Sequence, residues 1–107
     1  MSRFAEVVER LAAVIESRRG GNPMKSWSAR LLADPTLAAK KLAEESLETA
    51  LAGLREDKTA LAAESADLIY HWLAVLAGAG VTLEDVAAQL EAREGRSGLE
   101  EKASRRR

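Results

Sequence analysis

The chain holds few of the residues from which a β-sheet is built. Valine, isoleucine and threonine together occupy 12 of the 107 positions, and only four residues are aromatic. Strands are enriched in these residue types. Alanine and leucine, which favour helices, occupy 36 positions. We therefore predict an all-α protein, and its length fits a single domain.

Composition and charge exclude several classes of protein. Because the chain has no cysteine, a disulfide scaffold, a thiolate zinc site and a cysteine nucleophile are excluded. The formal net charge of −1 argues against a nucleic-acid binder, which needs an excess of positive charge. No apolar run reaches the roughly 18 residues that span a membrane, and none at the N-terminus is typical of a signal sequence. We expect a cytoplasmic protein that binds neither nucleic acid nor membrane.

Apolar spacing and capping residues predict a bundle of four main helices and one short helical segment. The first helix is capped by Ser2 and ends near Arg18-Arg19, before the break at Gly20-Gly21-Asn22-Pro23. The short segment covers residues 26–33, and the other main helices cover residues 35–54, 58–79 and 82–93. We expect residues 1–95 to form the domain. Residues 96–107 should be a polar tail, basic at its end and irregular or frayed.

The apolar faces of these helices are thin, because alanine is small. In the helix at 35–54, one face carries the apolar residues Ala43, Leu47, Ala50, Leu51 and Leu54. The helix at 58–79 is so apolar that we expect it to be buried nearly all round. Burying enough surface would then require a partner subunit.

Two acidic motifs on adjacent predicted helices are the most informative chemical feature. They are Glu44-Glu45-Ser46-Leu47-Glu48 and Glu64-Ser65-Ala66-Asp67. Residues three or four apart share a helix face, so each helix presents at least two carboxylates side by side. In the apolar helix an unpaired charge is costly, so these groups must be paired, protonated or bound to a cation. Mg²⁺ prefers such carboxylate oxygens.

Other interpretations of the same residues stay open. The first motif is also typical of a solvated face that pairs with Lys40 or Lys41, and the second could pair with an arginine. His71, one turn after Asp67, either forms a hydrogen bond with the Asp67 carboxylate or with a neighbouring helix, or it orients a metal ligand or relays a proton. Trp27 borders the glycine-rich break and is either a core anchor or a platform on which a base stacks.

Hydrolysis of a phosphoanhydride is the metal chemistry that fits these residues. A ferritin-like di-iron site needs two Glu-x-x-His motifs, and this chain has one histidine. A phosphate-binding P-loop is absent. Phosphate would therefore be held by metal ions and by basic side chains, of which Lys40 and Lys41 are the first candidates.

Four segments in order resemble the phosphoribosyl-ATP pyrophosphohydrolase family of histidine biosynthesis. They are residues 26–32 (SWSARLL), 40–48 (KKLAEESLE), 64–71 (ESADLIYH) and 93–105 (REGRSGLEEKASR). The acidic motifs alone resemble only the wider all-α, MazG-like nucleotide pyrophosphohydrolase superfamily. The departures are small: Ala43 stands where the family often has glycine, and Ser28 where threonine is common.

The resemblance implies hydrolysis of 1-(5-phosphoribosyl)-ATP to the AMP form and pyrophosphate, with Mg²⁺, by a cytoplasmic homodimer. It places the metal ligands at Glu45, Glu48, Glu64 and Asp67. Glu44 would assist catalysis, and His71 would contact a metal ligand without binding the metal itself. It also implies that the substrate is held by Lys40, Lys41, Arg30, Lys102 and Arg105. The alternatives are a house-cleaning pyrophosphohydrolase that acts on free nucleotides such as dUTP or dCTP, and a non-catalytic helical dimerisation module.

Overall fold

The computed structural model of the chain describes residues 2–95 and 98–105, without the side chains of residues 100, 101 and 104. Across these residues it contains six helices and no strand. They are α1 (Arg3–Ser17), α2 (Trp27–Ala33), α3 (Pro35–Leu54), α4 (Lys58–Ala79), α5 (Leu83–Glu91) and α6 (Gly98–Arg105). The prediction of an all-α fold with four main helices and a short segment is confirmed.

The prediction of an irregular tail is wrong for residues 98–105, which form α6. This helix has Lys102 and Arg105 in its last turn. Basic side chains at the C-terminal end of a helix interact favourably with the negative end of its dipole, which stabilises α6. The prediction failed because it took the high polarity of the tail as a sign of irregular structure. Arg106 and Arg107, which belong to the predicted basic end, lie outside the described residues.

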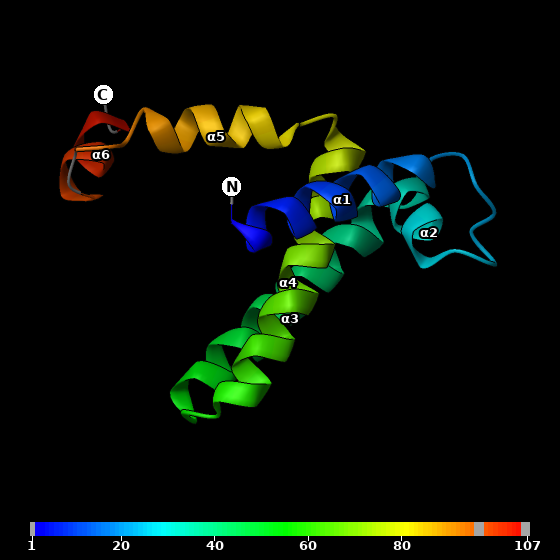
Figure 1. Cartoon of the computed structure of the whole chain (residues 1–107), viewed down its shortest axis with the longest axis horizontal. Coiled ribbons are helices and arrows are strands. Elements are labelled where there is room, and N and C mark those ends of the chain that lie inside the picture. The colour runs from blue at the N-terminus through cyan, green and yellow to red at the C-terminus, as the bar shows by residue number, and fades with distance from the viewer. Residues whose placement is uncertain (1, 96–97, 106–107) are drawn as a thin grey trace.

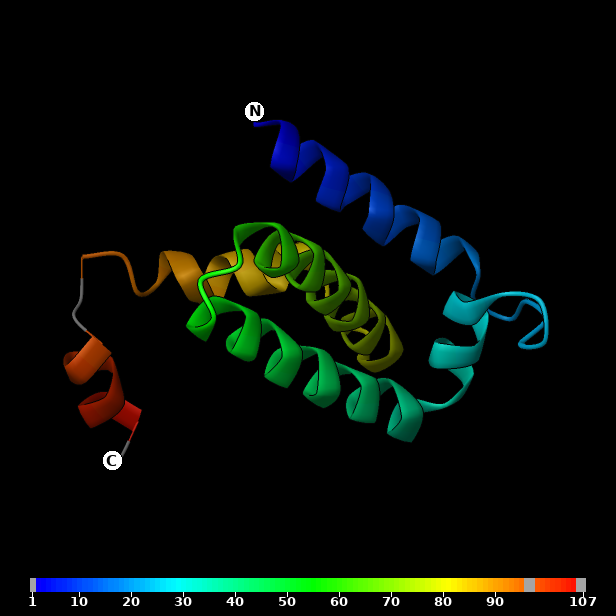
Figure 2. The same ribbon diagram turned by 90° about the horizontal axis from the view of Figure 1, so that it is seen from below.

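A long antiparallel hairpin of α3 and α4 organises the molecule (Figures 1 and 2). Local capping explains where its helices begin. The carboxylate of Asp34 accepts a hydrogen bond from the Leu37 amide at 3.1 Å, and that of Asp57 accepts one from the Ala60 amide at 3.0 Å. Pro35 occupies the start of α3, where a missing N–H costs nothing.

A small apolar core lies where α2 meets this hairpin. Leu31, Ala38 and Ala74 are buried there, and the partly buried side chains packed against them are Leu37, Tyr70 and Val75. Figure 2 shows α2 beside the end of the hairpin at which α3 begins, while α1 runs along α4. The core is therefore built largely from alanine and leucine, as the composition predicts.

Much of the apolar surface expected to be buried is exposed in the single chain. On α4 only His71, Leu73 and Ala74 are buried, so the prediction of burial nearly all round is wrong for one chain. On α3 the predicted apolar face points away from α4, and its Leu47 and Leu54 are 61% and 80% exposed. The physical reason is that α3 packs on α4 through a different face, formed by Ala38, Glu45 and Ala52.

The C-terminal part of the chain extends from this body as an arm. After Gly80 the chain turns through about 104° between α4 and α5, and Figure 1 shows α5 and α6 leading away from the hairpin. Among the described helices no single one is both long and apolar enough to cross a membrane. The bent pair of α4 and α5 passes that test of length and composition only when the two are taken together.

Candidate active site

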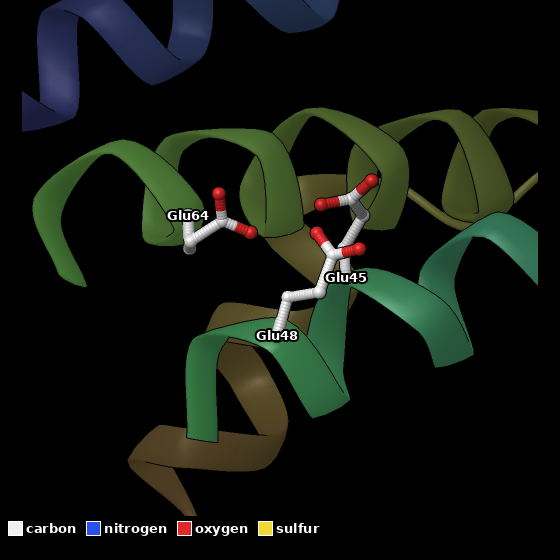
Figure 3. Close-up of side chains that lie close together, drawn as sticks. All are labelled: Glu45, Glu48 and Glu64. Atoms are coloured by element: carbon white, nitrogen blue, oxygen red, sulfur yellow. The ribbon is translucent and has the colours of Figure 1, made fainter. Parts of the chain in front are cut away.

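Three glutamates from two helices converge near the middle of the α3–α4 hairpin. Glu45 and Glu48 share one face of α3 because they are three residues apart, and Glu64 faces them from α4. One carboxylate oxygen from each lies within 4.8 Å of the others. Figure 3 shows the three carboxylates gathered between the two helices. We call Glu45, Glu48 and Glu64 the acidic centre.

Two oxygens of the acidic centre are buried without a hydrogen-bond partner. They are Oε2 of Glu45 and Oε2 of Glu64. Glu45 is only 7% exposed, and its other oxygen lies 3.7 Å from Nζ of Lys41. A buried carboxylate oxygen without a partner is costly, so the arrangement calls for a cation or a proton between the helices.

Mutual repulsion and burial raise the pKa of two of these carboxyls. Sharing a hydrogen bond with Glu48 is the main reason that the pKa of Glu64 lies above 4.5, and burial and the charges of Glu48, Glu45 and Asp67 add to it. For Glu45 burial is the main cause of the raised pKa, followed by its interactions with Glu48 and by the charge of Asp67. These residues fit a divalent cation, because it would remove the repulsion and give partners to both unpaired oxygens.

Thr49 joins the two helices at the acidic centre, and sequence reasoning missed it. Its hydroxyl lies 2.7 Å from the carbonyl of Glu45 and 3.1 Å from that of Glu64, and it can donate to either. The second contact crosses from α3 to α4. The available signal was a threonine one turn after Glu45 in a helix otherwise rich in alanine and leucine, which had no reason in local helix propensity.

Asp67 and His71 stand at the side of the acidic centre. The Asp67 side chain is exposed and lies outside the group of three glutamates, although its charge raises the pKa of Glu45 and Glu64. His71 is buried and places Nδ1 at 2.8 Å from the main-chain carbonyl of Asp67. The hydrogen bond to Asp67 is thus made to its backbone and not to its carboxylate, whereas the expected bond to a neighbouring helix is made with Trp27 of α2.

The predicted substrate-binding residues are only partly assembled in one chain. Lys41 lies 3.6 Å from the carboxylate of Glu44 and 3.7 Å from that of Glu45, so it stands at the edge of the acidic centre. Lys40 is exposed on the next position of α3. Glu44 is also exposed, and it lies outside the group of three glutamates.

The other predicted substrate-binding residues lie elsewhere. Arg30 is exposed on α2, where its guanidinium lies over the ring of Trp27. Lys102 and Arg105 are exposed on α6, at the end of the C-terminal arm (Figure 1). This arm does not pack extensively on α3 or α4, so one chain does not bring these two residues to its own acidic centre.

Comparison with known proteins identifies the family of this chain. Residues 8–94 match the family model described as Phosphoribosyl-ATP pyrophosphohydrolase. A protein of Caulobacter vibrioides named Phosphoribosyl-ATP pyrophosphatase is 60% identical over 103 residues, which cover 96% of both chains. A protein of the same name from Cereibacter sphaeroides is 51% identical, over 92% of this chain and 97% of its own length. Another from Methylobacterium nodulans is 49% identical, over 91% of this chain and 92% of its own length. The chain therefore belongs to the phosphoribosyl-ATP pyrophosphohydrolase family.

Proposed function

We propose that this protein hydrolyses phosphoribosyl-ATP to phosphoribosyl-AMP and pyrophosphate, a step of histidine biosynthesis, in the cytoplasm. The observation that carries the proposal is the acidic centre with its two unpartnered buried oxygens, in a chain 60% identical to a protein named for this substrate. In the reaction, water adds to a phosphorus of the anhydride between the first and second phosphates. The bridging P–O bond breaks, pyrophosphate leaves, and the proton of the water passes to solvent.

The acidic centre is proposed to hold Mg²⁺. Glu45, Glu48 and Glu64 would supply carboxylate oxygens, and Asp67 would complete the set by turning its exposed side chain inward. A bound Mg²⁺ supplies Lewis-acid polarisation of phosphate oxygens and lowers the pKa of its water. Support comes from the donor set itself, since carboxylate oxygens without nitrogen or sulfur are the ligands that magnesium prefers.

The remaining side chains are proposed to position the substrate. Before substrate binds, Glu44 would hold Lys41 at the edge of the acidic centre through their ion pair. Once a cation neutralises the charge of the acidic centre, Lys41 would leave Glu44 and Glu45 and bind a substrate phosphate. Lys40 would contact the outer phosphates. Thr49 would fix the spacing between α3 and α4 through its hydrogen bond across the helices.

A second copy of the chain is proposed to cover the outward apolar face of α3. This face carries Leu47, Leu51 and Leu54 in the open. Beside it, a largely apolar hollow of about 390 Å³ is lined by Leu42, Ser46, Leu68, Ile69 and Trp72. Exposed apolar surface of this extent is typical of an interface. In a homodimer each acidic centre would have a second C-terminal arm available, with the Lys102 and Arg105 of the other copy.

Light scattering coupled to size exclusion tests the homodimer. We expect the wild type to have twice the chain mass, and Leu51→Glu to shift it toward one chain, because the charge would be buried in the interface. Met24→Glu, which changes an exposed residue in the loop before α2, is the control and should stay dimeric. A wild type of single-chain mass would contradict the proposal.

Comparison of substrates tests the proposed reaction. Pyrophosphate release should be fastest from phosphoribosyl-ATP and at least about tenfold slower from dUTP and dCTP at equal concentration, a difference of about 1.4 kcal/mol in transition-state binding. Preference for the free nucleotides would favour a house-cleaning enzyme. Release from none of them, with no stabilisation by Mg²⁺, would favour a dimerisation module and overturn the proposal.

A further inference from the structure

Trp27, the first residue of α2, is a large aromatic side chain that one chain leaves open. Its side chain is 40% exposed, although it belongs to the element that packs on the core. The indole Nε1–H donates to Nε2 of His71 at 3.2 Å, and the two rings meet edge to face with centroids 6.3 Å apart. The edge of the indole is thus anchored while part of the ring stays accessible.

The anchor is rigid because both hydrogen bonds of His71 are determined. An indole N–H can only donate, so Nε2 of His71 must accept. Nδ1 then carries the proton and donates to the carbonyl of Asp67 at 2.8 Å. One residue along each helix, the hydroxyls of Ser28 and Tyr70 lie 2.6 Å apart and share a second hydrogen bond. Two adjacent hydrogen bonds therefore fix the start of α2 against α4.

The planar guanidinium of Arg30 lies over the ring of Trp27. The guanidinium of Arg30 lies 5.9 Å from the ring centroid, at the outer range of a cation–π contact. Arg30 is itself exposed and has a long, flexible side chain. A planar ring can therefore take a place against the indole while Arg30 lifts to cover it.

The position of Trp27 relative to the acidic centre suits a nucleotide. His71 follows Glu64 by seven residues on the same face of α4, which corresponds to about 10 Å along the helix. Trp27 lies next to His71. In a nucleotide, a ribose and the first phosphate separate the base from the anhydride that reacts. If the anhydride lies at the acidic centre, the base can reach Trp27.

We propose that Trp27, anchored by His71 and covered by Arg30, is the stacking subsite for the purine base of the substrate. This rests on the proposed function, which places the phosphates at the acidic centre. It gives Arg30, expected to bind phosphate, a different role. Stacking on an aromatic side chain does not depend on the identity of the base, because every base offers a π face.

Fluorescence titration with AMP tests the subsite without requiring turnover. The chain has two tryptophans, Trp27 and Trp72. A stacked purine should quench the emission of wild type and of Trp72→Phe, whereas Trp27→Phe should show no quench. Ribose 5-phosphate, which has no base, should quench none of the three. Absence of quench at millimolar AMP, or an equal quench in Trp27→Phe, would overturn the proposal whether or not the protein hydrolyses phosphoribosyl-ATP.

Steady-state kinetics give a second readout. Trp27→Ala should raise KM for phosphoribosyl-ATP by about 5- to 150-fold, the range expected for loss of one stacked base, while kcat changes much less. Trp27→Phe keeps an aromatic face and should keep KM within a few-fold of wild type. An unchanged KM in a folded Trp27→Ala protein would contradict the subsite, as would an equal fall in kcat in both variants, which would indicate a structural role alone.

Discussion

Glu45 on α3 and Glu64 on α4 each place one carboxylate oxygen in a buried position where it has no hydrogen-bond partner. The two helices thus meet across a pair of unsatisfied acceptors. Natural proteins satisfy nearly all buried polar atoms, so such a pair indicates a ligand that belongs between the helices. The following predictions concern this centre and the hairpin that holds it.

Replacing either residue with its amide should remove activity without unfolding the protein. Glu45→Gln and Glu64→Gln keep the shape of the side chain but lose the charge that holds a cation. We expect kcat/KM to fall by more than about 100-fold, because even residues that only orient metal ligands contribute 10- to 100-fold. Pyrophosphate release with phosphoribosyl-ATP measures this.

The matched control is Glu9→Gln on α1, an exposed glutamate outside the acidic centre. It should retain the activity of the wild type. Full activity in Glu64→Gln, or an equal loss in Glu9→Gln, would show that the acidic centre does not carry the reaction.

Without a divalent cation the acidic centre should destabilise the fold as pH rises. Because the pKa of Glu64 and that of Glu45 lie above 4.5 in the fold, the native state keeps protons that the unfolded chain has already lost. The free energy of unfolding contributed by these groups therefore falls as pH rises from about 4.5 through the raised values. In EDTA, Glu64→Gln should match the wild type near pH 4 and be more stable than it at pH 8.

Urea denaturation of both proteins at the two pH values checks this sign. Glu9→Gln again serves as the control and should show no pH-dependent difference from the wild type. A wild type that is more stable than Glu64→Gln at pH 8 in EDTA would mean that the carboxylate is stabilised by the chain itself.

The hydroxyl of Thr49 should stabilise the hairpin. Thr49→Val keeps the branched shape but removes the hydrogen bond to Glu45 or Glu64, at an expected cost of about 1 kcal/mol, or a fall in Tm of about 4–8 °C. Ser17→Ala is the control, because its exposed hydroxyl donates to the Val14 carbonyl of its own helix, α1. Thermal denaturation should show a loss for the first variant and little change for the second; equal values for both would refute the role of Thr49.

Local sequence signals predicted the elements well because their causes are local. Ser2 caps α1 through the Ala5 amide, and α1 ends at Ser17, just before the predicted break at Gly20-Gly21-Asn22-Pro23. Each of these signals acts within about one turn of its own helix. The spacing of Glu45 and Glu48 likewise fixes a shared face. These features need no knowledge of the distant chain.

Features that depend on packing between helices were harder to predict. Nothing in the sequence pairs Trp27 with His71, 44 residues away, or Thr49 with Glu64. Periodicity also identified the apolar face of α3 without saying what covers it. Leu47 and Leu54 satisfy the helical pattern yet lie open in one chain.

Two glycines near the end of α4 should respond to alanine with opposite signs. Gly78 lies inside the helix with open space at the position of a Cβ, so Gly78→Ala should stabilise the protein by about 0.5–1 kcal/mol. Gly80 ends the helix with φ of 73°, so Gly80→Ala should cost about 1–2 kcal/mol. Chemical denaturation measures both, and effects of the same sign would contradict the helix end described for α4.

The central claim is that the acidic centre holds the divalent cation required for pyrophosphate release. Its most direct test is the initial rate of release from phosphoribosyl-ATP while Mg²⁺ is titrated into the EDTA-treated protein. We predict no release before Mg²⁺ is added, a saturable rise afterwards, and no rise in Glu64→Gln at concentrations that saturate the wild type. Undiminished release in excess EDTA would contradict the claim.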